Sequence, residues 1–394
     1  MSQLPLQGMT VVTLEQAVAA PFATRQLADL GARVIKIERP GAGDFARGYD
    51  RTVKGLSSYF VWLNRSKESI TLDVKQPEAL DVLRALIARA DVFVQNLAPG
   101  AADRLGCSAA ALRAQGPSLI VCSVTGYGSS GPYATKKAYD LLVQGETGLV
   151  SINGSPDAAA KVPISIADIA AGMYAYTGIL TALLQRGRTG EGATIGVSLF
   201  DALAEWMSQP AYYTAFGAHA PERTGSRHAS IAPYGPFRTA DDTPVLLAIQ
   251  NEREWERFCG EVIGRPELAH DPRFASNTDR VCHRDELESI VNDALSKGSA
   301  AETIDRLERV GIACARMNSV EQFLEHPQLR ARARWTQIDS PAGALDVLLP
   351  PVAIDDVEPR MGPVPALGEH TTQVLGELGI SADTVAAWRA RGIV

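Results

Sequence analysis

Residues 9–38, with the sequence MTVVTLEQAVAAPFATRQLADLGARVIKIE, decide the fold. The apolar run at 9–13 predicts a β-strand, and the spacing of apolar residues at 21–30 predicts an α-helix. Gly31 ends this helix, and the apolar run at 33–38 predicts a second strand. Two strands joined by a helix of about ten residues form a parallel βαβ unit, so we expect an α/β fold.

The same alternation continues through the first third of the chain. A helix opened by Pro77 is expected at 77–89, and strands are expected at 91–94 and 118–123. We therefore predict a doubly wound parallel sheet, whose ligands bind outside the carboxyl ends of the strands. Further helices are expected at about 168–185 and 198–216.

Composition changes near residues 221–236, where basic residues stand among glycine and proline, and we place a domain boundary there. A hairpin is expected at 235–250, and helices are expected at 252–263, 285–297 and 301–310. These elements predict a smaller α+β domain. A length of 394 residues also suits about two domains.

Net charge and cysteine content exclude several classes of function. The net charge of −7 argues against a nucleic-acid partner, because binding to phosphate backbones needs a basic face. The five cysteines include no CxxC pair, so we expect neither a disulfide framework nor a metal site. Sparse cysteines fit a cytoplasmic protein.

No membrane segment is expected. The first residues of the sequence lack the basic and apolar regions of a signal peptide. The apolar stretch 164–184 is interrupted by Asp168, Gly172 and Gly178, and we interpret it as a buried helix rather than a membrane span.

Asp168 stands at the expected start of a helix, within ISIADIAAGM at 164–173. One interpretation is an N-cap, whose carboxylate accepts hydrogen bonds from free backbone N–H groups. The other interpretation is a nucleophile. The helix dipole would keep the carboxylate ionised, an ionised carboxylate can attack a thioester, and nearby N–H groups could hold the oxyanion. The local sequence leaves both interpretations open.

Basic residues are spread through the predicted loops that follow the strands. Arg39 directly follows the second strand and Asn96 the third, while Lys75, Arg104 and Lys137 lie in other loops. Each cation alone is typical of a solvated surface, but together they suit the phosphate groups of a ligand. The turn after the first strand has no GxGxxG, which disfavours NAD and FAD, and the chain has no Walker A, GxSxG or HExxH motif.

Several blocks of sequence follow one another in an order that a known family shares. They are AAPFATRQLADLGA at 19–32, VIKIE at 34–38, NRSK at 64–67 with ITLD at 70–73, VQNLAPG at 94–100, and LGEHT at 367–371. In these blocks the chain resembles the class III CoA-transferases, the family of formyl-CoA and carnitine CoA-transferases. The similarity covers nearly the whole chain.

The resemblance implies a site and a mechanism. Asp168 matches the family's catalytic aspartate, which carries mixed-anhydride and aspartyl-CoA thioester intermediates while CoA moves between carboxylic acids. Coenzyme A is then a substrate, and no permanently bound cofactor is implied. The positions that match CoA contacts of formyl-CoA transferases are Val18, Ala19, Arg39, Leu72, Asp73, Val74, Lys75, Asn96, Leu97, Arg104 and Lys137.

The resemblance also implies an architecture. The family forms an interlocked homodimer, with a large domain built from both termini and a small domain inserted between them. We therefore expect a large CoA-binding domain at 1–200, a linker helix at 201–225, a small α+β domain at 226–330, and a return to the large domain at 331–394.

One departure from the family bears on the substrate. Formyl-CoA transferases carry a glycine-rich loop in the small domain, but residues 225–235 read GSRHASIAPYG. This disfavours formate and oxalate. Together with QNEREW at 250–255, the stretch looks more like the branch acting on C4 and C5 dicarboxylates such as succinate, mesaconate, itaconate or citramalate. A second carboxylate needs a cationic clamp, for which the candidates are Arg47, Arg51, Arg227 and His228.

Two rival functions remain to be weighed. The α-methylacyl-CoA racemases share the fold but supply a histidine at the position that matches Tyr139, whereas this chain has no histidine before His219. Tyrosine is a poor base near neutral pH, which argues against racemisation. A non-catalytic CoA-binding protein would keep the basic residues without needing Asp168.

Overall fold

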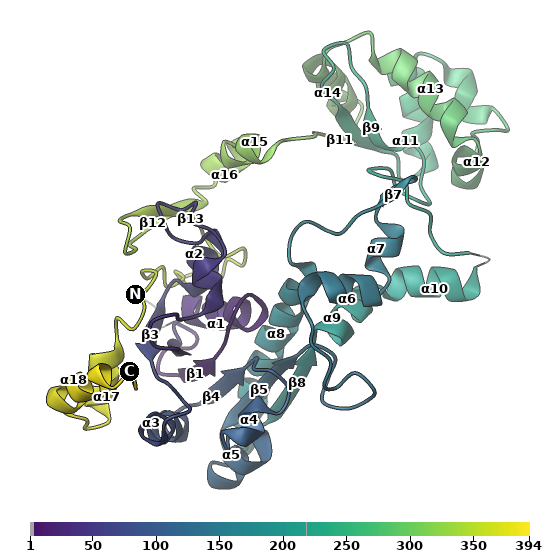
Figure 1. The fold of residues 1–394 in the computed structure, drawn as a ribbon. Coiled ribbons are helices and arrows are strands. Elements are labelled where there is room, and N and C mark those ends of the chain that lie inside the picture. Colours follow the sequence, from purple (N-terminus) through teal and green to yellow (C-terminus); the bar gives the residue numbers. More distant parts are fainter. Residues whose placement is uncertain (1–3, 218) are drawn as a thin grey trace. The chain divides into compact units, whose positions relative to one another are not determined.

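The computed structural model describes residues 4–217 and 219–394, which form two compact units (Figure 1). The large unit comprises Met1–Leu149, Val162–Gln209 and Leu329–Val394. The small unit comprises Val150–Lys161 and Pro210–Gln328. The large unit is therefore assembled from three separate segments of the chain.

The large unit is built on six parallel strands in the order β3-β2-β1-β4-β5-β8. The order reverses between β1 and β4, because β2 and β3 follow on one side while β5 and β8 follow on the other. The predicted α/β fold with a parallel sheet is thereby confirmed, and its switch point lies between β1 and β4. The strands are β1 (Thr10–Leu14), β2 (Arg33–Glu38), β3 (Lys67–Thr71), β4 (Val92–Gln95), β5 (Ile120–Thr125) and β8 (Thr194–Ser198).

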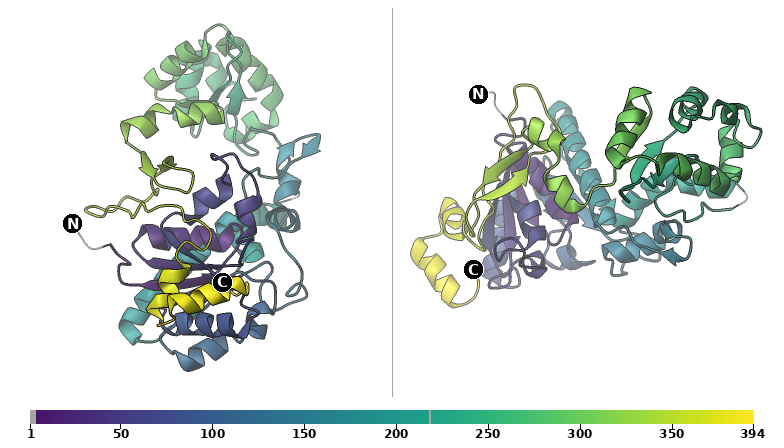
Figure 2. Two further views of the ribbon diagram at one scale, coloured as in Figure 1. Left: turned by 60° about the vertical axis from the view of Figure 1, so that its left-hand side comes forward. Right: turned by 90° about the horizontal axis from the view of Figure 1, so that it is seen from above.

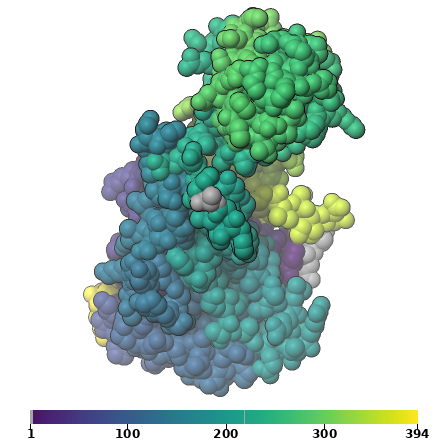
Figure 3. All heavy atoms as spheres, turned by 90° about the vertical axis from the view of Figure 1, so that its right-hand side faces the viewer, coloured from purple at the N-terminus to yellow at the C-terminus, as the bar shows by residue number. Residues whose placement is uncertain are grey.

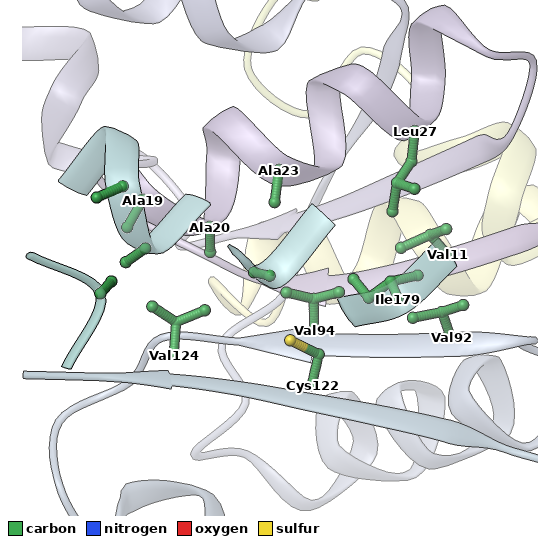
Figure 4. Packing of buried hydrophobic residues seen from close by; sticks show 14 of the residues in the cluster. Val11, Ala19, Ala20, Ala23, Leu27, Val92, Val94, Cys122, Val124 and Ile179 are labelled. Atoms are coloured by element: carbon green, nitrogen blue, oxygen red, sulfur yellow. The ribbon is translucent and has the colours of Figure 1, made fainter. Parts of the chain in front are cut away.

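Helices cover both faces of this sheet because successive strand residues point to opposite sides. Val11, Val92 and Val94 pack under one layer of helices (Figure 4), whereas Val12 and Phe93 face the other layer. Each such buried side chain contributes about 1.5–3 kcal/mol. The first layer contains α1 (Ala19–Asp29), α8 (Ile166–Thr189) and α9 (Leu199–Trp206), and the second contains α3 (Pro77–Ala88), α5 (Ala109–Gln115), α17 (Thr371–Glu377) and α18 (Ala382–Ala390).

The third segment of the large unit completes this core. Val374 of α17 and Val385 of α18 are buried in the second layer, and Figure 2 shows both helices in yellow against the sheet. A hairpin before them packs Ile338 against Phe60. The remaining elements of the large unit are η1 (Phe45–Gly48), α2 (Ser58–Asn64), α4 (Ala101–Arg104), α6 (Asp140–Glu146), β12 (Trp335–Ile338) and β13 (Leu345–Leu348).

The structure differs from the sequence-based prediction at the edges of the sheet. Strands β3 and β8 were not expected, because β3 begins with Lys67 and Glu68 and β8 contains Gly196, so neither is an apolar run. The helix expected at 198–216 is divided into α9 and α10 (Ser208–Phe216). Pro210 explains the division, since proline has no N–H and its ring clashes with a preceding helical carbonyl.

The small unit has its own core and forms the green body in Figure 3. Its three-stranded antiparallel sheet has the order β11-β10-β9, in which Val245 lies opposite Phe237 as the predicted hairpin requires. Trp255, Phe258 and Phe274 fill the core. Its elements are β9 (Tyr234–Phe237), β10 (Val245–Ala248), α11 (Glu252–Arg257), a π-helical turn (Phe258–Ile263), α12 (Asn277–Cys282), α13 (Arg284–Leu295), α14 (Ala300–Arg309) and β11 (Ala313–Arg316).

The boundaries of the small unit also differ from the expected 226–330. The unit begins at Pro210, and it includes residues 150–161, which were expected in the large domain. Arg223 attaches this second stretch, because its guanidinium donates to the carbonyl oxygens of Ser151, Ser155 and Pro156 at 3.0–3.1 Å. Sequence patterns do not show such contacts between a side chain and a distant backbone.

Helix α8 is the one helix of the described residues that is long and apolar enough to cross a membrane. Its Ala170, Ala171, Ala175 and Ile179 are buried in the core of the large unit. Length and composition are weak evidence for a span, since buried core helices meet the same criteria. The helix is thus packed in the core along one face, with 39% of its apolar 18-residue window buried.

Candidate active site

The switch point of the sheet is closed by hydrogen bonds between the loops after β1 and β4. Gln16 N donates to Asn96 Oδ1, and Asn96 Nδ2 donates to Gln16 O, each at 2.8 Å. Ligands of doubly wound sheets bind at this edge. The two loops therefore form the floor of the candidate site, with Asn96 fixed beside the turn that leads into α1.

Helix α1 begins without a capping side chain. Its N-cap is Val18, which has no oxygen to offer to the amides of the first turn. No hydrogen bond from the amides of Val18, Ala19 or Ala20 is present in the part of the chain that the structure describes. These N–H groups and the positive end of the helix dipole are suited to receive an anion or a developing oxyanion.

Asp168 is the third residue of α8, and the N-cap is Ser165. The N-cap interpretation of Asp168 is therefore wrong. Within the described residues its carboxylate accepts no hydrogen bond, although the side chain is half-buried. Leaving a buried polar group unpaired is unfavourable for folding, so this carboxylate contributes more to function than to stability.

Gly172 brings the start of α8 against the start of α1. A Cβ atom at Gly172 would lie 2.6 Å from Ala19 O and 3.0 Å from the Phe22 side chain, so the approach requires glycine. Asp168 lies one turn before Gly172 on the same face of α8. The start of α8, which carries Asp168, therefore packs against the first turn of α1, where the amides are free.

The environment of Asp168 disfavours its ionised form. Burial, and then the negative charge of Asp140, raise the pKa of Asp168 from its usual 3.8 to about 7. Asp140 is itself fixed, because its Oδ1 accepts from Ala167 N at 2.8 Å and its Oδ2 accepts from Gln144 Nε2 at 2.7 Å. The expectation that the helix dipole keeps Asp168 ionised is corrected, since desolvation and Asp140 outweigh the dipole and leave the carboxyl partly protonated at neutral pH.

An aromatic side chain lies near the same carboxylate. Burial, and then the charges of Asp44 and Asp168, raise the pKa of Tyr49 to about 12. The Tyr49 ring contacts Tyr59 edge-to-face at 5.4 Å between centroids and lies 5.7 Å from the Phe45 ring. Because Tyr49 is 47% exposed, its ring offers an apolar wall to a bound acyl group.

A set of buried and largely buried charges, which we name the charged layer, lies next to these loops. Lys36 Nζ is 2.7 Å from Asp44 Oδ2, and Lys67 Nζ is 2.7 Å from Glu15 Oε1. Burial would raise the pKa of Glu15, but Lys67 and Lys36 outweigh burial and lower that pKa to about 2. The charged layer consists of Glu15, Lys36, Glu38, Asp44, Arg47 and Lys67.

The positions expected to contact CoA follow the strands of the sheet, on loops and, for Ala19 and Arg104, in helices α1 and α4. Exposed Arg39 donates to Gln16 Oε1 at 3.3 Å, and within the described residues Lys75, Arg104 and Lys137 make no ion pair and are exposed. Unpaired cations along one edge suit the phosphates of CoA. Of the remaining positions, Val18, Ala19 and Leu72 are buried, and Asp73, Val74, Asn96 and Leu97 are half-buried.

Two of the four candidates for a cationic clamp, Arg47 and Arg51, belong to the large unit. Arg47 donates to Glu38 from Nε at 2.8 Å and from Nη2 at 2.7 Å, and its guanidinium lies 3.6 Å from the Phe60 ring centroid. Arg47 is thus engaged in the charged layer, and its assignment to a substrate clamp stays a prediction. Arg51 is exposed in the large unit.

The other two clamp candidates lie in the small unit. Arg227 pairs with Glu288 at 2.9 Å, and the His228 ring stacks on Tyr234 with 5.1 Å between centroids. His228 Nδ1 also accepts from Ser230 N at 3.2 Å. Both side chains already have partners in their own unit.

Sequence reasoning missed Asp140 and Tyr49, which interact electrostatically with Asp168, and Gln16 and Asp44, which hold the turn before α1. Asp140 follows Tyr139 directly, but nothing in the local sequence links it to Asp168, because the two meet only through the capping of α8. No cluster of three or more His, Cys, Asp or Glu side chains suited to a metal occurs among the residues that the structure describes.

Several known proteins are similar to this chain over most of its length. An acetyl-CoA:oxalate CoA-transferase from Acetobacter aceti is 38% identical over 330 residues, which cover 83% of this chain and 84% of that protein. A succinate–glutarate CoA-transferase from Agrobacterium fabrum is 34% identical, covering 95% of this chain and 96% of that protein. The crystal structure of a CAIB/BAIF family protein from Brucella suis is 32% identical with a TM-score of 0.84, covering 96% of this chain and all of that one.

These relatives and the fold agree with the resemblance that the sequence blocks indicated. The model of CoA-transferase family III matches residues 6–371, which span the sheet, Asp168 and the whole small unit. The chain therefore belongs to CoA-transferase family III.

Proposed function

We propose that Asp168 is the nucleophile of a CoA transfer between two carboxylic acids. The observation that carries this proposal is a half-buried carboxylate without a hydrogen-bond partner among the described residues, at the end of α8 that packs against the uncapped first turn of α1. A pKa of about 7 suits the role, because the carboxylate is available near neutral pH and is more basic than an ordinary aspartate.

The first half of the cycle loads CoA onto the protein. The Asp168 carboxylate attacks the acyl-CoA carbonyl, a C–O bond forms, the C–S bond breaks, and a mixed anhydride and CoA thiolate result. The free amides of Val18, Ala19 and Ala20 are suited to stabilise the negative charge on the attacked oxygen. The thiolate then attacks the aspartyl carbonyl, which releases the donor acid and leaves an aspartyl-CoA thioester.

The second half of the cycle reverses these steps with a new acid. The acceptor carboxylate attacks the aspartyl thioester and releases CoA thiolate, which then attacks the acceptor's acyl carbonyl and regenerates the Asp168 carboxylate. Throughout, Arg39, Lys75, Arg104 and Lys137 are suited to hold the phosphates of CoA. A thiolate tethered in this way returns in an effectively intramolecular step.

The acceptor is proposed to be a dicarboxylate of four or five carbons. Support comes from the sequence of residues 225–235 and from a relative named for succinate and glutarate. Another relative is named for oxalate, a shorter dicarboxylate, although the absence of a glycine-rich loop at 225–235 disfavours oxalate as a substrate. Both names share a second carboxylate. The cations proposed to bind it are Arg51, Arg227 and His228, because Arg51 and Arg227 are exposed and His228 is half-buried, whereas the Arg47 side chain is 19% exposed.

We also propose an interlocked homodimer in the cytoplasm. Large apolar side chains support a partner, since Phe216 is 88%, Val320 72% and Leu184 69% exposed. Five free cysteines agree with a reducing compartment. Light scattering should give a dimeric mass, and tagged and untagged subunits should fail to exchange unless they are unfolded together.

Hydroxylamine trapping tests the nucleophile. Wild-type protein exposed to succinyl-CoA should form a hydroxamate on Asp168, located by peptide mass spectrometry, and Asp168→Asn should form none and transfer no CoA. Asp103→Asn removes an exposed carboxylate in α4 and serves as the control, with wild-type activity expected. Activity surviving in Asp168→Asn would refute the proposal.

A substrate panel tests the acceptor and the rival function. Succinate, glutarate, mesaconate, itaconate, citramalate, oxalate and formate are offered with succinyl-CoA, and products are read by mass spectrometry. Transfer to C4 or C5 acids should exceed transfer to oxalate and formate. Exchange of the α-proton in deuterated water without any acyl transfer would instead favour a racemase.

A further inference from the structure

Asp44 joins two segments that flank Asp168. This carboxylate is only 2% exposed, and its Oδ1 accepts from Ala17 N at 3.0 Å and from Ala46 N at 2.9 Å. Ala17 belongs to the turn that leads into α1, whereas Ala46 belongs to η1, whose C-cap is Tyr49. One oxygen atom therefore fixes both the turn that presents the free amides and the segment that carries the aromatic wall.

The turn at Ala17 requires such support. Its φ of 62° lies in the left-handed region, which costs a residue with a Cβ about 1–2 kcal/mol. The hydrogen bonds from Gln16 to Asn96 hold one side of the turn, and the bond from Ala17 to Asp44 holds the other. Without Asp44, the turn would relax towards an ordinary conformation, and the amides that follow it would change direction.

Asp44 is fixed in its turn by rigid neighbours. Lys36, a fully buried residue of β2, donates from Nζ to Asp44 Oδ2 at 2.7 Å. The Asp44 backbone N–H donates to Glu38 Oε2 at 2.9 Å. Both partners belong to a central strand, so the carboxylate has one available orientation, as is required of a group that positions others.

We propose that Asp44, held by Lys36, is a positioning residue for the transfer reaction. It contacts no substrate, and it acts through Ala17 and Ala46 by directing the first-turn amides of α1 at the carbonyl that Asp168 attacks. This inference rests on the proposed function of Asp168.

A pair of double variants separates the acceptor oxygen from the buried charge. Asp44→Asn with Lys36→Met removes both charges but keeps an oxygen for the amides of Ala17 and Ala46. Asp44→Leu with Lys36→Met removes the oxygen as well. The leucine variant should show a kcat roughly 100-fold below that of the asparagine variant, because a displaced oxyanion donor costs about that much. The KM for succinyl-CoA should change less than about threefold, since phosphate binding is untouched.

A matched control distinguishes positioning from stability. Asp29 and Arg65 form a similarly buried pair at 2.8 Å near the other end of α1, with side chains 3% and 5% exposed, and Arg25 donates to the same Asp29 carboxylate at 2.6 Å. Asp29→Asn with Arg65→Met should lower the melting temperature while kcat of the folded protein stays within about twofold of wild type. If kcat follows melting temperature across all these variants, Asp44 has only a structural role.

Substitutions at Ala17 test the same idea with the charged layer intact. Ala17→Val should lower kcat to a similar extent as the leucine variant, because a β-branched residue avoids positive φ. Ala17→Gly, added to the leucine variant, should restore part of kcat, because glycine adopts this φ without strain.

The two proposals can fail independently of each other. If Asp168→Asn remains active, the proposed nucleophile is wrong whatever the Asp44 variants do. If Asp168→Asn is inactive while the leucine variant and Ala17→Val both keep the wild-type kcat, the nucleophile stands and the positioning role is overturned.

Discussion

Replacing Asp168 by asparagine should stabilise the protein in a manner that depends on pH. Folding raises the pKa of this carboxyl from 3.8 to about 7. Between these values the folded chain binds more protons than the unfolded chain, so the wild type loses stability as the pH rises through this window. A tenfold change in proton affinity corresponds to about 1.4 kcal/mol, and the full shift therefore corresponds to about 4 kcal/mol.

Asparagine carries no charge that must be desolvated. The gain in unfolding free energy of Asp168→Asn over wild type should therefore be near zero below about pH 4, grow between about pH 4 and 7, and level off at about 4 kcal/mol above pH 7. Urea unfolding followed by circular dichroism, at one protein concentration and several pH values, measures this difference. The exposed Asp103→Asn variant should show no such pH-dependent gain.

A gain that stays constant from acid to neutral pH would refute the reasoning, because it would reflect improved packing rather than relief of a buried charge. A loss of stability at pH 8 would refute it more strongly, since that would require a partner for the carboxylate. A stability gain that grows with pH would show that Asp168 destabilises the folded protein at neutral pH. An aspartate retained at such a cost is typical of a functional site.

Three further predictions concern activity and stability. The kcat/KM for CoA transfer should rise about tenfold between pH 6 and 8 with a midpoint near 7, because only the carboxylate form of Asp168 attacks. Asp140→Asn should move the midpoint of this pH profile to lower pH, because it removes the negative charge beside Asp168. Gly172→Ala should lower the unfolding free energy by about 1–3 kcal/mol and reduce kcat, since α1 must move away from α8, as thermal melting and steady-state rates would show. Arg47→Met should cost up to about 3–5 kcal/mol in urea unfolding, because the buried Glu38 carboxylate loses its bidentate ion pair and keeps only the hydrogen bonds from Ser69 and Asp44, without changing the preference among acceptor acids.

Local apolar patterns were sufficient to predict the centre of the sheet. Strands β1, β4 and β5 are runs of mainly apolar buried residues, and β2 places Val34, Ile35 and Ile37 among charged residues. Strand β3 escaped prediction because Lys67 is polar, and its burial becomes possible only when Glu15, far away in the sequence, supplies the opposite charge. Prediction failed there because a long-range ion pair overrides local polarity.

Some residues of the candidate site could likewise be predicted from the sequence, and others could not. Asp168 was found because it stands at the expected start of a helix and matches the catalytic aspartate of the family that the sequence resembles, and Asn96 because it follows a predicted strand. The influence of Asp140 on the pKa of Asp168 could not be foreseen, since it depends on the contact between α6 and the start of α8. The pairing of Arg47 could not be predicted, because a free surface arginine and one paired with Glu38 have the same local sequence signature.

The balance of the charged layer restricts how this sequence can change over evolutionary time. It contains three carboxylates and three cations, so one neutral substitution strands an opposite charge away from water, at a penalty of about 3–5 kcal/mol. That penalty is a large fraction of the stability of an ordinary domain. Substitutions at these six positions should consequently occur in pairs that replace a carboxylate and its cation together. Mutational scans should find strong epistasis between these positions, although they are distant in the chain.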